Sequence, residues 1–467
     1  MKNFSSTWLI ISIAIFFRLC LAFLIPPSAD ESYYLLWAKH PALSYVDHPG
    51  MIAWINILFI FIFREPLFAI RLASLFCLGS TLFFIYKSSF LYSGNKENAA
   101  QTTLFFLLIP YIFIVGITMQ VEQPLLLFSS MIIYFFLKLE QTLNVRYWYI
   151  LAMVSALCLL SKYTGVLLIV FLFGYILYKK ELRQLVRSKE FLISLVLFFL
   201  ALLPLILWNM QNQFISLSFH AARLGTQLNF SGSIDFLLEQ ILYFSPFGLF
   251  YLIKAIKKQP KHLFLILGLF IFISFLFLSM YTKVWGHWTA IMYIPLAIYI
   301  GIILNGILIR ANILQGFFTI LLVVILLFTG PAVLIHYPKI MKNYSLGKNL
   351  EPIIYSLSDN LSIISDFHGS VGQLSYYLNK TVYFPQGEFK NPAAWGSKQF
   401  SLWFMPKIKT NDNVLFFTKP DEEKIAHLKK IFKEVEVLPN PVLTVMEGHI
   451  NEKRFLLCKS ARFDFIF

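Results

Sequence analysis

The sequence is dominated by apolar runs that recur along most of its length, separated by short polar breaks. A helix needs about 20 predominantly apolar residues to cross a bilayer core. Because the chain is 58% hydrophobic and only 13% charged, it is typical of a multi-spanning membrane protein rather than a soluble one. We expect about eleven spans, near 7–26, 67–92, 100–117, 121–140, 147–161, 164–178, 191–209, 236–253, 263–281, 288–309 and 312–335. The apolar segment 51–63 is short, and we expect it at the membrane interface.

The distribution along the chain of the Lys and Arg residues, which give a net charge of +15, predicts how the chain is oriented. Cytoplasmic loops of membrane proteins are enriched in Lys and Arg, and a cytoplasmic N-terminus places the basic runs 179–189 and 254–261 on that side. We interpret both runs as topology signals, and we expect no nucleic-acid partner. Segment 7–26 is followed by no small-residue cleavage site, so we expect an uncleaved first helix.

Residues 336–467 have a different pattern, in which short apolar stretches alternate with polar ones. IISDFHGSVGQLSYYLNKTVYF predicts a strand, a helix and a second strand, and NVLFFTK predicts another strand before the helical EEKIAHLKKIFKEV. The prediction is therefore an all-α membrane domain over 1–335 and a small α/β domain over 336–467. This topology places the second domain on the outer, periplasmic face. Cys20, Cys77 and Cys158 fall within expected spans, which gives no support for a disulfide framework or redox chemistry.

The first outer loop groups acidic residues beside a short amphipathic helix. Asp30 and Glu31 precede the helical pattern YYLLWAKH, and Asp47 and His48 follow it. Carboxylates near a membrane boundary are costly unless they are solvated or paired, so they indicate a functional site. They suit general-base catalysis or the binding of a divalent cation. The plainer interpretation is a solvated outer loop.

Basic residues on the same predicted face suit phosphate binding. Lys162 lies between two short spans, where solubility does not require a charge, and Arg223 and Lys283 occupy other outer loops. Each could instead be an ordinary loop residue. His220 and His287 are metal ligands or simple hydrogen-bonding groups; the metal candidates are Asp47, His48 and His287. Arg18, inside the first span, is expected to pair with an acidic residue such as Glu122, or else to contact substrate.

Several motifs in order along residues 7–300 resemble those of GT-C glycosyltransferases. The resemblance is to the protein O-mannosyltransferase-like group, which includes the lipid A aminoarabinose transferases. The motifs are ADESYYLLWA at 29–38, YVDHPG at 45–50, MQVEQPLLLF at 119–128, LLSKYTGVLL at 159–168, PLILWNMQNQFISLSFHAARL at 204–224 and WGHWTAIMYIP at 285–295. Two positions depart from the family pattern: Gly50 replaces a second proline, and Glu122 stands where Asp is usual.

The resemblance implies a fold, a reaction and a set of residue roles. Enzymes of this group take a sugar from a polyprenyl monophosphate on the outer face of the membrane, so the resemblance implies a bacterial inner-membrane enzyme. Its acceptor would be lipid A, LPS core or another glycan, or alternatively a protein. It implies no nucleotide or redox cofactor and leaves a divalent cation open. The implied catalytic residues are Asp30, Glu31, Asp47 and His48. The implied substrate and phosphate-binding residues are Glu122, Lys162, Tyr163, Arg223 and Lys283.

Two other classes of function fit a chain of this kind. A transporter or lipid flippase also buries charged residues among its helices. However, the sequence has no repeated halves or paired broken spans, and its carboxylates cluster toward one face. A non-catalytic assembly scaffold, with the tail as its working part, is the other alternative.

Overall fold

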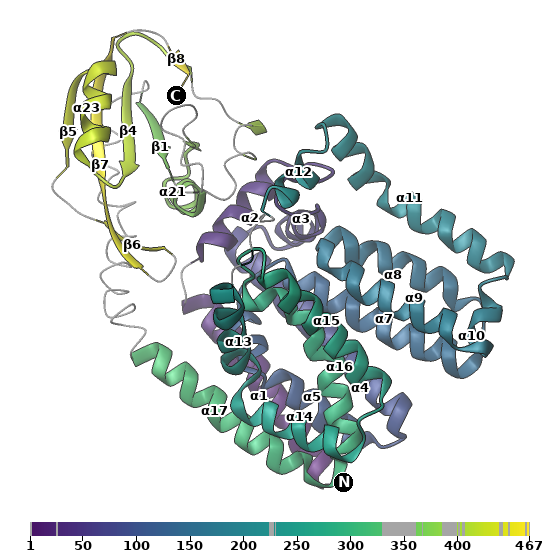
Figure 1. Ribbon diagram of the computed structural model, residues 1–467. Helices are drawn as coiled ribbons and strands as arrows, with labels where there is room; N and C mark the ends of the chain where they lie inside the picture. Colours follow the sequence, from purple (N-terminus) through teal and green to yellow (C-terminus); the bar gives the residue numbers. More distant parts are fainter. Residues whose placement is uncertain are drawn as a thin grey trace. The chain divides into compact units, whose positions relative to one another are not determined.

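The computed structural model describes most of the chain and divides it into two compact units. The described residues are 2–24, 27–223, 228, 230–328, 361–366, 368–384, 399, 402–403, 407–438, 442–446, 449–462 and 465–466. The first unit contains residues 1–25 and 42–322, and the second contains 26–41 and 323–467. Each is described here by itself (Figure 1).

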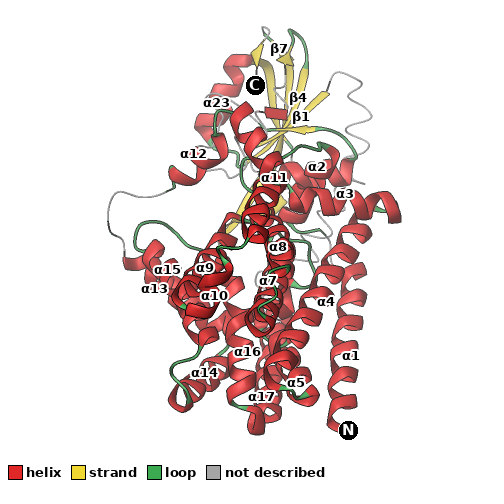
Figure 2. Ribbon diagram, turned by 90° about the vertical axis from the view of Figure 1, so that its right-hand side faces the viewer, coloured by secondary structure: helices red, strands yellow, loops and turns green. Residues whose placement is uncertain are grey.

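The first unit, hereafter the helical unit, is built from helices alone among its named elements. They are α1 (Lys2–Leu24), α3 (Met51–Phe63), α4 (Pro66–Ser93), α5 (Lys96–Leu107), α6 (Pro110–Val115), α7 (Glu122–Thr142), α8 (Tyr147–Ser161), η1 (Tyr163–Gly165), α9 (Val166–Tyr178), α10 (Lys180–Leu185), α11 (Lys189–Gln211), α12 (Ile215–Ala221), α13 (Phe230–Phe244), α14 (Pro246–Lys258), α15 (Leu263–Ser279), η2 (Gly286–Met292), α16 (Tyr293–Ile303), η3 (Asn305–Ile307) and α17 (Leu308–Phe328). Helix α7 packs between α4 and α8, and α8 in turn packs on α11 (Figure 2).

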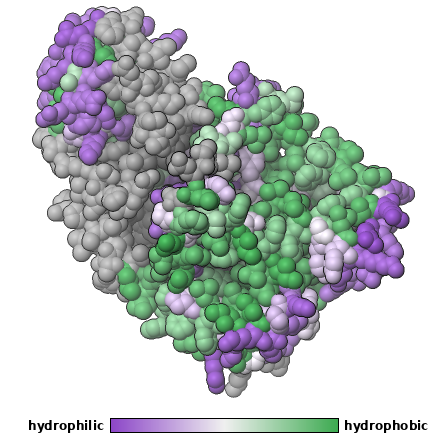
Figure 3. All heavy atoms as spheres, viewed as in Figure 1, coloured by the Kyte–Doolittle hydropathy of each residue, from purple (hydrophilic) through white to green (hydrophobic). Residues whose placement is uncertain are grey.

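Several of these helices are suited to a membrane. Within the described residues, five are long and apolar enough to cross one: Pro66–Ser93, Glu122–Thr142, Lys189–Gln211, Gly286–Ile303 and Asn305–Val323. The bent pair α13 and α14 adds a sixth if it forms one span, and five further apolar helices are shorter. Hydrophobic side chains cover a broad area of the visible face of this unit (Figure 3). The chain is therefore a multi-pass membrane protein by composition, and the figure of about eleven spans remains a prediction.

Three predicted spans are broken: 288–309 is interrupted at Leu304, between α16 and η3, and the other two are interrupted at a proline. The segment 236–253 forms α13 and α14, which meet at an angle of 91°. Ser245 between them has a φ of 76° and caps α14 by accepting a hydrogen bond from the backbone of Gly248, while Pro246 begins the new helix. The segment 100–117 is likewise divided by Pro110 into α5 and α6. Proline lacks the N–H that a continuous helix needs, so it starts a helix more readily than it continues one. Residues 329–335 of the last predicted span lie outside the described residues.

The second unit contains a mixed sheet with helices against it. Its strands are β1 (Leu361–Ser365), β2 (Val382–Tyr383), β4 (Asn413–Thr418), β5 (Phe432–Val437), β6 (Val442–Met446) and β7 (His449–Ala461). Five follow the order β2-β1-β4-β7-β5, with β6 paired to β7. Strands β2, β1 and β4 are parallel, whereas β7 is antiparallel to β4 and β5. A separate antiparallel pair joins β3 (Lys407–Ile408) to β8 (Phe465–Ile466). The strand, helix and strand predicted for this stretch are β1, α21 (His368–Leu378) and β2.

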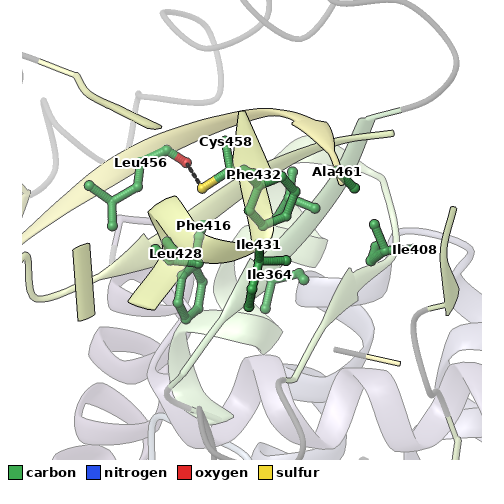
Figure 4. Packing of buried hydrophobic residues seen from close by; sticks show 10 residues of the cluster. Ile364, Ile408, Phe416, Leu428, Ile431, Phe432, Leu456, Cys458 and Ala461 are labelled. Atoms are coloured by element: carbon green, nitrogen blue, oxygen red, sulfur yellow. Dashed lines mark hydrogen bonds between the residues drawn. The ribbon is translucent and has the colours of Figure 1, made fainter. Parts of the chain in front are cut away.

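A compact apolar core supports this sheet. Helix α23 (Glu422–Ile431) contributes Leu428 and Ile431, which pack with Phe416 of β4 and Leu456 of β7 (Figure 4). The predicted helix over 422–435 is shorter than expected, because the chain continues from Phe432 as strand β5. Its alternating residues FKEVEV favour a strand with one buried face.

Helix α2 (Ala29–Lys39) lies in the second compact unit, together with the tail. It packs on α21. Gly372 permits the close approach, because a Cβ at this position would lie 2.8 Å from the backbone of Ser32 and Tyr33. The Gln373 side chain also donates a hydrogen bond of 3.2 Å to the carbonyl of Pro27. The segment that carries Asp30 and Glu31 is thus built together with the tail.

Candidate functional site

A buried ion pair forms the centre of the candidate site in the helical unit. Lys162 Nζ lies 2.5 Å from Glu122 Oε1, and the two residues are only 4% and 3% exposed. Glu122 is the first residue of α7, where a negative charge interacts favourably with the helix dipole. Burying two charges is costly unless they are paired, so this geometry holds both in one arrangement.

The local sequence explains how Lys162 reaches this position. Helix α8 ends at Ser161, and Lys162 is extended, with φ −159° and ψ 137°. The short turn η1 then leads directly into α9. Gly165 in this turn packs closely on Cys158, since a Cβ there would lie 2.6 Å from the Cys158 sulfur. The predicted hairpin between two short helices is therefore present, with its lysine directed inward.

The turn η2 brings an imidazole and an indole to the pair. His287 Nε2 lies 3.9 Å from Glu122 Oε1, and its ring stacks on Tyr111 with centroids 6.3 Å apart. The Trp288 ring centroid lies 5.8 Å from Lys162 Nζ and 5.9 Å from Cζ of Arg223. Two cations therefore approach the same aromatic ring, as in cation–π contacts.

Polar residues of α13 hold η2 in place. Glu239 accepts a hydrogen bond from the backbone N–H of Gly286, and Gln240 donates one of 2.9 Å to the Gly286 carbonyl. Thr289 and Tyr293 both donate to Oε1 of Gln240. Glu239, Gln240 and Trp288 are not among the candidate residues predicted from the sequence. The available signal was a pair of polar residues inside an otherwise apolar predicted span.

The loop before α3, which contains Asp47 and His48, lies against α12. His220 Nε2 lies 3.0 Å from the Asp47 backbone oxygen, and because a carbonyl can only accept, this nitrogen carries the proton. The ring centroids of His48 and His220 are 6.4 Å apart. Tyr163 shares a hydrogen bond of 2.9 Å with Ser216 and meets the His220 ring edge-on.

The electrostatics of this loop are dominated by burial among cations. Burial lowers the pKa of His220 to about 4, and the charge of Arg223 acts in the same direction. Burial also holds the pKa of His48 well below its usual range, with further contributions from Lys162, His220 and Arg223. The pKa of Arg223 falls to about 10 through burial, and the Asp47 carboxylate opposes this shift. Both imidazoles are therefore neutral near pH 7, and the fixed positive charges come from Lys162 and Arg223.

The helical unit thus brings Asp47, His48, Glu122, Lys162, Tyr163, Arg223 and His287 into one region. Lys283 instead contacts Trp285, with Nζ 4.0 Å from the ring centroid. The expected Arg18–Glu122 pair is not formed, because Glu122 is occupied by Lys162. Arg18 donates to the carbonyl of Ala14 and lies over the ring of Phe113.

Asp30 and Glu31 are described within the second unit. Ser28 and Glu31 form a capping box at the start of α2: the Glu31 N–H donates to Ser28 Oγ at 3.1 Å, and the Ser28 N–H donates to Glu31 Oε2 at 3.0 Å. Glu31 is fully buried, whereas Asp30 is exposed. The carboxylate of Glu31 therefore has a structural role at this helix end, and Asp30 is the carboxylate open to solvent.

The metal candidates do not form a ligand set in the described part of the chain. No group of three or more His, Cys, Asp or Glu side chains there could hold a metal ion. His48 and Asp47 are neighbours, but His287 contacts Glu122 instead.

Comparisons with known proteins extend the likeness to the whole chain. Residues 47–208 match the model of the family described as dolichyl-phosphate-mannose-protein mannosyltransferase. No curated protein matches the chain. Among solved structures, apo ArnT from Cupriavidus metallidurans has a TM-score of 0.69 at 14% sequence identity, with 97% of this chain and 98% of that chain covered.

ArnT from the same organism bound to undecaprenyl phosphate has a TM-score of 0.64 at 12% identity, with 96% of this chain and 97% of that chain covered. At this level of identity the likeness concerns the fold. The family match covers Asp47, His48, Glu122 and Lys162 of the candidate site. These findings agree with the resemblance noted in the motifs: residues 47–208 match the mannosyltransferase family model, and the chain has the ArnT fold over nearly its whole length.

Proposed function

We propose that this protein is a membrane glycosyltransferase that moves a sugar from a polyprenyl phosphate to an acceptor on the periplasmic face. The observation that carries the proposal is the buried Glu122–Lys162 pair with Arg223 beside it around Trp288. Such a cluster is costly to build for stability alone, because buried ion pairs are seldom worth more than an apolar replacement. Perturbed, partly buried charges of this kind mark functional sites.

The site suits the departure of a lipid phosphate. When the bond between the sugar and the phosphate breaks, negative charge grows on the phosphate oxygens. Lys162 offers a compact ammonium and Arg223 a planar guanidinium, and both interact strongly with phosphate in a water-poor site. Fixed cations aimed at developing charge lower the barrier without reorganisation during the reaction. Glu122 holds Lys162 in place, and Tyr163 would position the donor beside it.

The acceptor needs a base or an orienting carboxylate. We assign this role to Asp30, the exposed carboxylate at the start of α2. Asp47 and His48 would bind the acceptor side or a divalent cation, and Lys283 would contact the donor at the edge. If the acceptor is already an anion, Asp30 orients it instead of removing its proton.

The comparisons support a lipid-linked donor and suggest an acceptor. A solved structure of the same fold contains undecaprenyl phosphate. We propose lipid A or LPS core as the acceptor, with protein as the alternative in view of the mannosyltransferase family match. The enzyme would lie in a bacterial inner membrane, with a cytoplasmic N-terminus and the tail domain in the periplasm. It would be a hexosyl- or pentosyltransferase.

A transporter or flippase is the rival from another class. The bend of 91° between α13 and α14 is a broken span of the sort that transporters use. It lies beside η2, however, and its polar residues hold that turn through Glu239 and Gln240. The bend therefore has a structural role in positioning His287 and Trp288, which fits a fixed catalytic site.

The donor-binding assay tests the phosphate site directly. Full-length protein in detergent would be titrated with undecaprenyl phosphate, comparing wild type with Lys162→Ala. The control is Lys179→Ala, because Lys179 also pairs with a glutamate, Glu140, at 3.6 Å, but on an exposed surface. We expect at least a tenfold weaker affinity for Lys162→Ala and no change for the control. Equal affinity for folded Lys162→Ala protein would rule out the phosphate role.

Mass spectrometry of the lipid A and LPS of a deletion strain then tests the acceptor. One missing sugar on either glycolipid is the expected result. An unchanged glycolipid profile together with an under-glycosylated protein would favour the protein acceptor.

A further inference from the structure

A cavity lies in the helical unit, away from the candidate site. It measures about 450 Å³ and is lined by Lys254, Lys257, Lys258, Leu304, Gly306 and Ile307. Its walls are the last turns of α14 and the break between α16 and α17. Both views place this end of α14 far from α3 and α12, which carry the loops of the candidate site (Figures 1 and 2).

The three lysines share one face of α14 but have different surroundings. They are spaced i, i+3 and i+4, so their side chains are neighbours on the helix surface. Lys258 Nζ donates a hydrogen bond of 2.9 Å to the carbonyl of Ile303, which ends α16. All three lysines are exposed, and none of them forms an ion pair with any described carboxylate. The cavity is therefore positively charged without a protein counter-charge.

The helix dipole does not account for the whole arrangement. Basic residues in a last turn complement the negative end of a helix, and this explains Lys257 and Lys258. Lys254 lies one turn earlier. In the other basic run, near α10, Lys179 is paired with Glu140, while Lys180 and Arg183 are exposed. The feature that goes beyond a plain topology signal is the cavity that the α14 lysines line.

Exposed apolar side chains lie next to the cavity on both α14 and α17. On α14, Phe250 and Ile253 are 56% and 54% exposed, and each lies four residues before a lysine of the cavity. On α17, Ile309 and Ile313 are 43% and 65% exposed. Both α17 and the bent pair α13–α14 are candidate spans, so these exposed apolar side chains suit contact with lipid, and lysines at the end of such a span suit the level of the headgroups.

The geometry points to a binding site for an anionic phospholipid, with its phosphate and headgroup in the lysine-lined cavity and its acyl chains along α14 and α17. An ammonium group attracts a phosphate as a point charge, and the adjoining apolar surface favours a ligand that carries hydrocarbon. A free phosphate would gain nothing from the apolar strips. This site is separate from the donor site and does not depend on the proposed reaction.

Native mass spectrometry of the full chain in detergent tests the site. The probes are dioleoyl phosphatidylglycerol and dioleoyl phosphatidylcholine, which differ in headgroup charge. The test variant is Lys254→Gln/Lys257→Gln, which leaves the Lys258 hydrogen bond intact. The matched control is Lys180→Gln/Arg183→Gln, which removes two exposed charges from α10. A further variant, Lys254→Arg/Lys257→Arg, keeps the charge and checks that a loss is not caused by misfolding.

We expect phosphatidylglycerol to bind more tightly than phosphatidylcholine to the wild type. Each lysine near a membrane surface changes the affinity for an anionic lipid about 5-fold, so the double Gln variant should bind phosphatidylglycerol about 30-fold more weakly. The control and the Arg variant should retain wild-type affinity. Equal binding of both lipids, wild-type affinity of the double Gln variant, or an equal loss in the control would each overturn the proposal. So would full displacement of the lipid by millimolar inorganic phosphate, which would mark a site for the free anion.

Discussion

The Glu122–Lys162 pair makes the most direct prediction, because both charges are almost completely buried. Lys162→Met leaves the Glu122 carboxylate without its cation, and Glu122→Gln leaves the ammonium without its anion. Removing one member of a buried pair costs about 3–5 kcal/mol in the free energy of unfolding. His287 Nε2, 3.9 Å from the same carboxylate oxygen, is a poor substitute for an ammonium at 2.5 Å.

The double variant Glu122→Gln/Lys162→Met distinguishes the pair from two independent residues. Neither charge then remains buried, so we expect it to be more stable than the sum of the two single losses by about 2 kcal/mol or more. Each single variant should lower the melting temperature in detergent by about 5–8 °C at a fixed scan rate, given the unfolding entropy of a unit of this size.

The surface pair Lys179–Glu140 provides a matched double-mutant cycle. Its interaction free energy should be about 0–1 kcal/mol. Strictly additive losses at Glu122 and Lys162 would refute the argument that the two charges stabilise each other in the folded state.

Four further outcomes follow from the structure. The free energy of unfolding should fall as the pH drops from about 6.5 toward 4. In this range His220 binds a proton in the unfolded chain but stays neutral in the folded protein, where its pKa is about 4. His220→Gln should flatten the dependence of melting temperature on pH, and an unchanged slope would contradict this. Gly165→Ala should reduce folded yield on size-exclusion chromatography, because its Cβ meets the Cys158 sulfur, and Cys158→Ala should restore it. Asp30→Asn should slow sugar transfer by about 10²–10⁴-fold at unchanged melting temperature, and a near wild-type rate would exclude it as the base. Glu31→Ala should instead cost about 0.5–2 kcal/mol of stability with little effect on rate, since it removes the side chain that caps α2.

The sequence predicted most helices because apolar runs of membrane length are a strong local signal. It failed where a single residue overrides that signal, as Pro246 and Pro110 do in two of the predicted spans. Lys162 and Glu122 could be proposed individually from their odd positions between apolar runs. Their pairing could not, because they are 40 residues apart and meet only when α7 and α8 pack together.

Other residues of the site act through contacts that leave only a weak signal in the sequence. Gln240 and Glu239 lie in a predicted span, and their hydrogen bonds to Gly286 become visible only once α13 lies beside η2. The motif at residues 29–38 indicated the chemistry of its carboxylates but not the helix on which it packs. Local pattern alone cannot reveal that α2 packs on a helix more than 300 residues later in the chain.

The packing of α2 on α21 has a consequence for exchanging parts between related proteins. The buried aromatic rings of α2, Tyr33 and Trp37 among them, belong to the same compact unit as the tail. Replacing only residues after 323 would confront α2 with a foreign partner at the close contact that Gly372 makes possible. Residues 26–41 and the tail therefore form one transplantable cassette, although the chain encodes them at opposite ends. A chimera that exchanges both segments together should fold, and acceptor choice should move with it if Asp30 serves the acceptor.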